Sequence, residues 1–114
     1  MYISVFMKQK EIKFRAWQDG QMLHQAGFGN YAIARFIGFI YEDAPIMQFT
    51  GVKDKNGIEV YEDDICKIQG VIDNQVICRK TDCFAPEYSS QTLSTLIEIG
   101  LTCEVVGNIH DVKE

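Results

Sequence analysis

Short runs of alternating apolar and polar residues dominate the chain and predict a β-rich protein. Residues 11–17 alternate strictly, and their apolar side chains would share one face of a half-buried strand: Ile12, Phe14 and Ala16. Residues 18–20 form a turn cluster, and residues 21–24 predict the return strand of an N-terminal hairpin. Trp17 falls out of phase with the apolar face, so we expect its ring to cover an edge or mark a contact surface.

The central dipeptide Asn56-Gly57 is the strongest turn signal in the chain. A two-residue type I′ turn needs positive φ at both central positions, which Asn and Gly tolerate. Apolar residues alternate on both sides of the dipeptide: Met47 and Phe49 before it, Ile58 and Val60 after it. The pattern therefore predicts a tight β-hairpin with Asn56 and Gly57 at its tip.

Residues 28–44 allow two interpretations. Four residues have the spacing of one helix face, and Asn30 would suit the cap: Ile33, Phe36, Ile37 and Ile40. Gly38 and the aromatic and β-branched content favour a strand instead. We expect extended structure here and keep the helix as the alternative.

Turn residues divide the second half of the chain into short strands. Two further turns are expected, at Glu62, Asp63 and Asp64 and at Asp73-Asn74. The strands around them would cover residues 65–68, 70–72, 75–78 and 103–109. One short helix is indicated by Leu93, Leu96 and Ile97, which lie between the capping residues Ser89 or Ser90 and the terminating Gly100.

Close strand spacing with turns between the strands predicts a mainly β fold, α+β at the margin. We expect a small β-barrel with an N-terminal hairpin and one short helix near the C-terminus. A chain of 114 residues suits a single domain over residues 1–114, with residues 1–10 as a possible extension. Five apolar strand residues are expected to share one core: Phe14, Phe49, Val60, Ile65 and Ile109.

The net charge of −5 is unevenly distributed. Residues 1–50 carry a net charge of +1 and residues 51–114 carry −6. An acidic total argues against non-specific nucleic-acid binding, which depends on Lys and Arg. The basic cluster of Lys8, Lys10, Lys13 and Arg15 is interpreted as a solvated strand face, with a phosphate-contacting patch as the alternative. Without an apolar run long enough for a membrane helix or a signal sequence, the protein is expected in the cytosol.

Two groups of residues are candidate metal ligands: the cysteines, and the carboxylates Glu62, Asp63 and Asp64, which we interpret instead as turn residues. Cys78 and Cys83 are five positions apart, and His24 or His110 could complete a zinc site. Cys66, Cys78 and Cys103 lie in apolar strands, however, where cysteine packs as a small hydrophobe. We predict reduced core cysteines, no metal and no cofactor. No catalytic triad or phosphate-binding glycine loop is recognisable, so we expect no enzymatic activity.

Three patterned segments together resemble the YopX family, small proteins known mainly from bacteriophages and prophages. The first covers residues 11–17, the second covers residues 47–57 and continues through 60–62 to 64–65, and the third covers residues 106–109, in the family's order. The family's usual glycine after Glu62 is replaced by Asp63, and the acidic-aromatic tail after Ile109 is shortened. If position 63 needs positive φ, Asp is a tolerable but poorer residue than Gly. The resemblance implies an SH3-like β-barrel core, plausible self-association and no established reaction.

The leading functional interpretation is a non-enzymatic accessory protein of phage type in the bacterial cytoplasm. It would act as an oligomeric binding or assembly module, with its partner unidentified and its interface near Trp17, Tyr2 and Phe6. These three residues are aromatic, and an apolar N-terminal run is costly to leave exposed. The alternative is a nucleic-acid-associated regulator, since small SH3-like barrels often bind nucleic acid.

Overall fold

The computed structural model describes residues 12–29, 32–80 and 83–111, and these residues form a mainly β protein. The elements are β1 (Phe14–Gln18), β2 (Gln21–His24), the 3₁₀ helix η1 (Gln25–Phe28), α2 (Ala32–Phe39), β3 (Ile46–Lys53), β4 (Glu59–Tyr61), β5 (Asp64–Ile68), β6 (Gln75–Lys80), β7 (Cys83–Pro86), α3 (Leu93–Glu98) and β8 (Cys103–Asn108). The mainly β content, the N-terminal hairpin and the short helix near the C-terminus confirm the sequence prediction. Among the described helices, none is long and apolar enough to cross a membrane.

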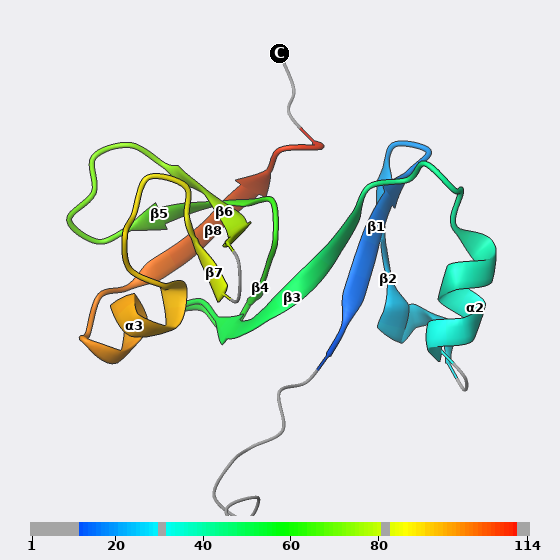
Figure 1. Ribbon diagram of the computed structural model, residues 1–114, viewed down its shortest axis with the longest axis horizontal. Coiled ribbons are helices and arrows are strands. Elements are labelled where there is room, and N and C mark those ends of the chain that lie inside the picture. The colour runs from blue at the N-terminus through cyan, green and yellow to red at the C-terminus, as the bar shows by residue number, and fades with distance from the viewer. Residues whose placement is uncertain (1–11, 30–31, 81–82, 112–114) are drawn as a thin grey trace, which may run out of the picture.

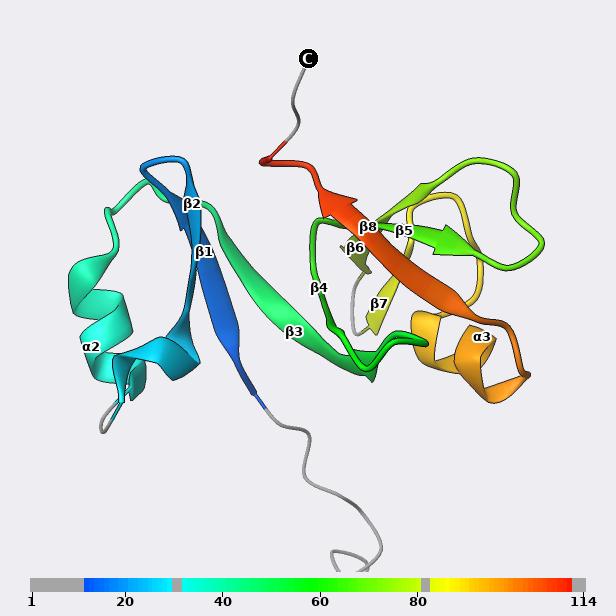
Figure 2. The same ribbon diagram turned by 180° about the vertical axis from the view of Figure 1, so that it is seen from behind.

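Two four-stranded antiparallel sheets make up the structure. Their strand orders are β2-β1-β3-β4 and β7-β6-β5-β8. Figure 1 shows β1, β2 and α2 on one side of the long strand β3, and the curved second sheet with α3 on the other. We call the first group the N-terminal half, and we call the second group, together with β4, which packs on it through Val60, the half-barrel. Seen from behind, β8 runs diagonally across the half-barrel (Figure 2).

The main core lies in the half-barrel. It contains Val60, Cys66, Ile68, Ile77, Leu93 and Cys103, drawn from β4, β5, β6, α3 and β8. The predicted shared core of Phe14, Phe49, Val60, Ile65 and Ile109 is therefore wrong in part. Phe49 and Val60 are buried, but Phe14 and Ile65 are only half-buried and Ile109 is 41% exposed.

The alternation of β5 explains why Ile65 lies outside the core. Asp64, Cys66 and Ile68 are buried on one face of the strand, whereas Ile65 and Lys67 lie on the other face. A β-bulge lies opposite, in β8, because Ile65 faces Gly107 and Cys66 faces Val105, which leaves Val106 as the extra residue. Ile109 lies beyond the end of β8.

Strand β1 is covered on both faces, unlike the half-solvated strand that its alternation predicts. Ala16 and Gln18 are buried on one face, where the Gln18 side chain forms hydrogen bonds with the backbone of Phe39, the last residue of α2, and of Tyr41 just after it. Arg15 is buried on the opposite face, toward the half-barrel. The polar side chains of β1 therefore form hydrogen bonds within the protein rather than with water, because neither face of the strand is open to solvent.

The expectation of extended structure in residues 28–44 is wrong, because α2 is a helix. Phe36 is the one buried residue of α2, and its ring meets the ring of Phe28 edge to face at 5.6 Å. Phe39 also approaches Phe28, with 5.6 Å between ring centroids. This aromatic contact anchors one helix face and outweighs the strand propensity of the segment. The expected cap, Asn30, lies outside the described residues.

The hairpin at Asn56-Gly57 is confirmed, but its turn is longer than predicted. Residues 54–58 connect the Lys53–Glu59 strand pair, and Gly57 has a φ of 81°. Asn56 does not have positive φ, so this is not a type I′ turn. Asp54 stabilises the longer turn, because its carboxylate accepts hydrogen bonds from the amides of Asn56 and Ile58.

Three other local expectations have mixed outcomes. Asp63 has a φ of 72°, so this position does require the conformation that glycine adopts most easily. The strand expected at residues 70–72 is wrong, because residues 69–74 form the connection from β5 to β6 and Ile72 is 99% exposed. Helix α3 is confirmed, but its cap is Thr92 rather than Ser89 or Ser90.

Candidate functional site

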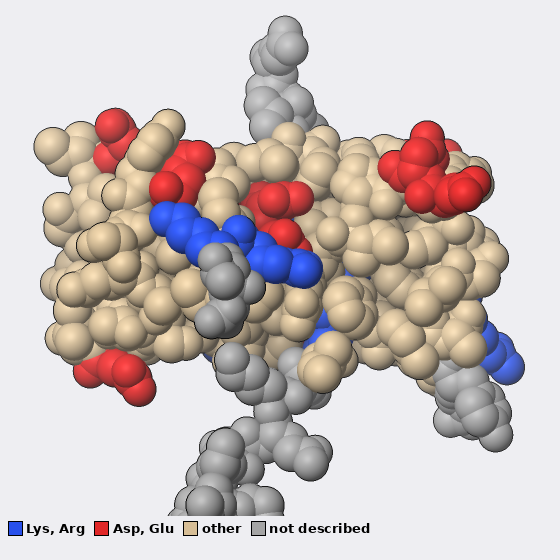
Figure 3. All heavy atoms as spheres, in the orientation of Figure 1, with Lys and Arg blue, Asp and Glu red and all other residues tan. Residues whose placement is uncertain are grey.

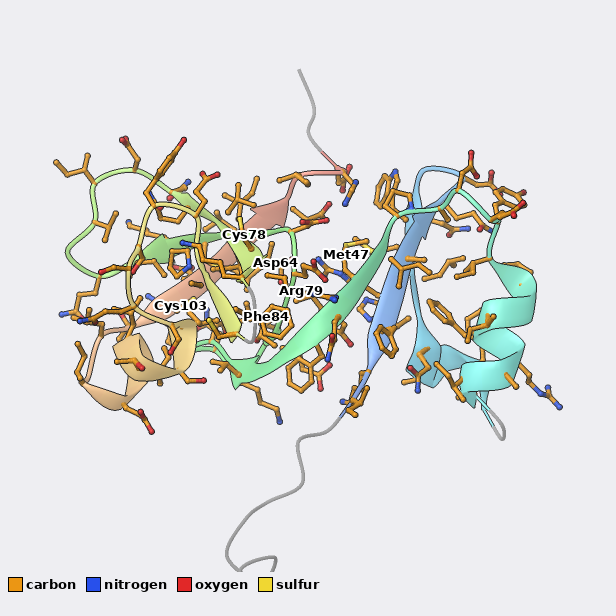
Figure 4. All side chains as sticks on the ribbon, in the orientation of Figure 1. Met47, Asp64, Cys78, Arg79, Phe84 and Cys103 are labelled. Atoms are coloured by element: carbon orange, nitrogen blue, oxygen red, sulfur yellow. The ribbon has the colours of Figure 1, made fainter. Side chains whose placement is uncertain are left out.

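A buried ion pair joins the N-terminal half to the half-barrel. Arg15 Nη2 lies 2.8 Å from Asp64 Oδ1, and Asp64 Oδ2 accepts the amide hydrogen of Tyr61 at 2.7 Å. The Arg15 guanidinium also lies over the Tyr61 ring, 4.6 Å from its centroid. Figure 4 shows Asp64 between the half-barrel and β3. The two halves thus share charged groups that are almost completely buried.

The environment of this ion pair shifts the pKa of its neighbours. Burial raises the pKa of Asp64, against the opposing effects of the Tyr61 amide and Arg15. Burial and the Glu59 carboxylate raise the pKa of Tyr61 to about 12. Partial burial and the Arg15 charge lower the pKa of His24, whose ring meets Tyr61 edge-on at 5.5 Å. The phenol and imidazole therefore stay neutral at neutral pH.

The same residues line a cleft of about 350 Å³ between the two halves. Its opposite wall comes from the β3–β4 turn and β8, through Gly57, Ile58 and Val105. Lys13 pairs with Glu59 at its edge. Within the described residues, every buried side-chain nitrogen and oxygen has a hydrogen-bond partner. We therefore interpret this cluster as a joint that fixes the two halves, since its charges neutralise one another.

The aromatic residue expected at an interface, Trp17, is engaged within the chain. Its ring stacks on His110, with centroids 6.3 Å apart and planes inclined by 22°. His110 Nε2 lies 2.9 Å from Asp63 Oδ2, in the turn between β4 and β5. This contact ties the end of the chain to β1 and leaves Trp17 half-buried. Tyr2 and Phe6, the other expected interface residues, lie outside the described residues.

The remaining predicted site residues occupy separate positions. Asn56 and Gly57 lie at the exposed hairpin tip, and Glu62 lies in the β4–β5 turn, where it pairs with Arg79 at 2.9 Å. The possible zinc ligands are also dispersed. Cys78 on β6 faces Ala85 and Cys83 on β7 faces Lys80. His24 packs against Tyr61, and His110 binds Asp63. In the described part of the chain, no three His, Cys, Asp or Glu side chains gather as a metal site would require.

Helix α2 carries three large apolar side chains that are accessible to solvent. Ile33, Ile37 and Phe39 are 42%, 61% and 57% exposed, and we call these three residues the α2 surface. Phe36 points inward and holds the helix against η1. Figures 1 and 2 place α2 on the outer side of the β1–β2 hairpin, away from the half-barrel. Uncharged side chains form most of the surface over this half in Figure 3.

The helical spacing of Ile33 and Ile37 was the sequence signal for this surface. Residues four apart lie on the same helix face, so both isoleucines can meet one partner. The expectation of extended structure obscured that signal. A second hollow, of about 360 Å³, lies in the half-barrel between Ile68, Pro86 and Leu96.

Together these features define a small, mainly β protein with a polar joint and an accessible apolar helix. Residues 32–114 match the family described as YopX protein. The chain therefore belongs to the YopX family, as its sequence segments predicted. The matched region begins at α2, whereas residues 11–17 precede it.

One solved structure supports the arrangement of elements. The crystal structure of protein EF1440 from Enterococcus faecalis is similar with a TM-score of 0.52 and 20% sequence identity. The similarity covers 90% of this chain and 96% of that chain. At this level of identity it concerns the fold alone. No curated protein matches the chain.

Proposed function

We propose that the protein is a non-enzymatic accessory protein, encoded by a phage or prophage, that acts as an oligomeric binding or assembly module. The α2 surface carries this proposal. Its three large side chains are exposed although the helix is anchored by Phe36, so the surface is presented on a fixed support. Exposed apolar groups of this kind are typical of protein interaction sites.

The half-barrel would serve as the structural platform of this module. The β3–β4 turn docks on β8 through two hydrogen bonds: the Lys55 amide donates to the Cys103 carbonyl and the Val105 amide to Asp54, each at 2.9 Å. Such closure of a strand pair onto a curved sheet supports an SH3-like barrel. The four free cysteines of the chain support a reducing compartment, the bacterial cytoplasm.

A nucleic-acid-associated regulator has less support. Four basic side chains are already paired with carboxylates, which are Lys13 with Glu59, Arg15 with Asp64, Lys55 with Glu104 and Arg79 with Glu62. In Figure 3, the largest group of basic side chains lies beside acidic ones. Binding to nucleic acid needs basic groups that are free to neutralise phosphates and displace the counterions around them, so this arrangement disfavours a nucleic-acid surface.

Sedimentation equilibrium at micromolar protein tests the proposal. We expect the wild type to form a dimer or a larger closed assembly, and Ile37→Ser to weaken it roughly tenfold, since removal of one buried isoleucine costs about 1–2 kcal/mol. Ile72→Ser makes the same chemical change on the β5–β6 connection and should leave the association unchanged. A wild-type monomer that binds duplex DNA at physiological salt would favour the regulator instead.

A further inference from the structure

The hollow of about 360 Å³ in the half-barrel is separate from both the joint and the α2 surface. Three connections contribute to it: β5–β6 (residues 69–74), β7–α3 (residues 87–92) and α3–β8 (residues 99–102). Figures 1 and 2 show these connections on the side of the half-barrel that faces away from the N-terminal half. We propose that this hollow binds a small uncharged organic molecule that combines an apolar body with an amide group.

The apolar part of the lining comes from five residues. Ile68 of β5 and Pro86 of β7 contribute buried side chains, and Val71, Leu96 and Leu101 contribute more accessible ones. None of the described residues that line the hollow carries a charge. A charged ligand would therefore lose hydration without meeting an opposite charge, whereas an uncharged apolar body gains from burial.

The polar part of the lining has hydrogen-bonding groups to spare. Tyr88, Ser90 and Gln91 are exposed, and their side chains form no hydrogen bond within the described part of the chain. Two hydroxyl groups and one carboxamide offer both donors and acceptors. An amide needs partners of both kinds, so these three side chains suit a ligand that carries one.

Hydrogen bonds hold the connections in place without a ligand. Lys80 Nζ donates to the Ser89 carbonyl at 2.9 Å, and the Gln91 amide donates to Ser89 Oγ at 3.0 Å. The Gln69 amide donates to the Thr102 carbonyl at 2.9 Å, which joins the β5–β6 and α3–β8 connections. Because the loops are already ordered, a ligand that enters the hollow loses little free energy in ordering them.

The volume limits the size of the ligand. About 360 Å³ lies near the lower end of the range for small-molecule pockets, which is roughly 300–1,000 Å³. A bicyclic aromatic amide, indole-3-acetamide, is therefore a suitable probe. Indole-3-acetate is its matched control, because it has the same ring system with a carboxylate in place of the amide.

Titration of the full ¹⁵N-labelled chain, followed by nuclear magnetic resonance, tests the site. With indole-3-acetamide we expect saturable shifts of the Val71, Ser90, Gln91 and Leu101 amide signals and a dissociation constant on the order of 1 mM, which is ordinary for a probe of this size. Indole-3-acetate should bind about tenfold more weakly. Equal binding of the anion, shifts confined to the α2 surface, or no saturable shift up to about 10 mM would overturn the proposal.

Two matched variants locate the bound probe. Ser90 and Ser94 are both exposed, and only Ser90 lines the hollow. Ser90→Lys supplies a positive charge there, so it should shift the ratio of the two dissociation constants several-fold in favour of indole-3-acetate. Ser94→Lys should leave the ratio unchanged. An equal shift in both variants, or none in Ser90→Lys, would overturn the assigned position.

Binding at the hollow does not depend on the α2 surface. A monomeric protein that binds indole-3-acetamide at the hollow would support the site and refute the assembly function. An oligomer that fails to bind the probe would do the reverse.

Discussion

Replacing Asp54 by alanine tests how the hairpin tip is held against β8. Asp54 is buried, and its carboxylate accepts three backbone hydrogen bonds: from Asn56 at 2.8 Å, Ile58 at 2.9 Å and Val105 at 2.9 Å. The first two shape the turn, and the third connects the turn to the half-barrel. The substitution therefore removes a local and a long-range constraint together.

The size of the effect follows from the surroundings of the three amides. Asn56 and Ile58 lie in an exposed turn, so water can replace the lost acceptor at a cost of about 0.5–1 kcal/mol each. The Val105 amide is part-buried, and leaving it without an acceptor costs about 1–3 kcal/mol. We expect Asp54→Ala to lower the free energy of unfolding by about 2–5 kcal/mol. Asp54→Asn keeps one acceptor oxygen and should cost about half as much.

The pH dependence of the effect provides a second, independent measurement. Burial alone would raise the pKa of Asp54, but the amides of Val105, Ile58 and Asn56 lower it below the ordinary 3.8. A lowered pKa in the folded state means that the carboxylate stabilises the fold above pH about 4. This contribution is lost as the pH falls through the folded-state pKa. The gap between wild type and Asp54→Ala should therefore narrow below pH 4.

Urea unfolding followed by far-UV circular dichroism, at pH 7 and at steps down to pH 3, measures both quantities. Asp73→Ala, in the exposed β5–β6 connection, is the matched control and should change the free energy of unfolding by less than about 0.5 kcal/mol. Equal stability of wild type and Asp54→Ala at pH 7 would refute the assigned role of the carboxylate. A gap of constant size from pH 7 to pH 3 would refute the charge-based explanation.

Three further predictions concern the turn, the joint and the metal content. Gly57→Val should lower the free energy of unfolding by about 1–3 kcal/mol, because Gly57 has a φ of 81°, which a β-branched residue rarely adopts. Asn56→Ala should lower it far less. Equal melting temperatures for these two variants would contradict the prediction. Arg15→Ala should cost about 3–5 kcal/mol, because it leaves the buried Asp64 carboxylate unpaired, and adding Asp64→Asn should cost less than the sum of the single changes. Excess chelator should leave the melting temperature unchanged, and stoichiometric zinc by elemental analysis would overturn this.

Local patterns were sufficient for the elements whose signals depend on neighbouring residues. The hairpin at Gly57 and helix α3 could be predicted because turn conformation and helix spacing are encoded within a few positions. The family could also be recognised, since its segments recur in order along the chain.

The conformation of residues 32–39 shows where local patterns become ambiguous. Helical spacing and strand propensity were both present, and contact of Phe36 with Phe28 of η1 favours the helix. That contact depends on the path that the chain takes after the β1–β2 hairpin. The exposure of the α2 surface could therefore be established only from the tertiary structure, although the helical spacing of Ile33 and Ile37 already indicated that they share one helix face.

The polar joint and the bulge were decided by the tertiary structure alone. Arg15 looked like a solvated strand residue, yet it is buried against Asp64, which is 49 positions away along the chain. The face of β5 that carries Asp64, Cys66 and Ile68 is buried and Ile65 is not, while the extra residue of the bulge, Val106, lies in β8. The sequence by itself determined the short strands, most of the turns and the family, because neighbouring residues set backbone conformation. Which of their side chains are buried, paired or left exposed depended on partners brought together only when distant strands pack.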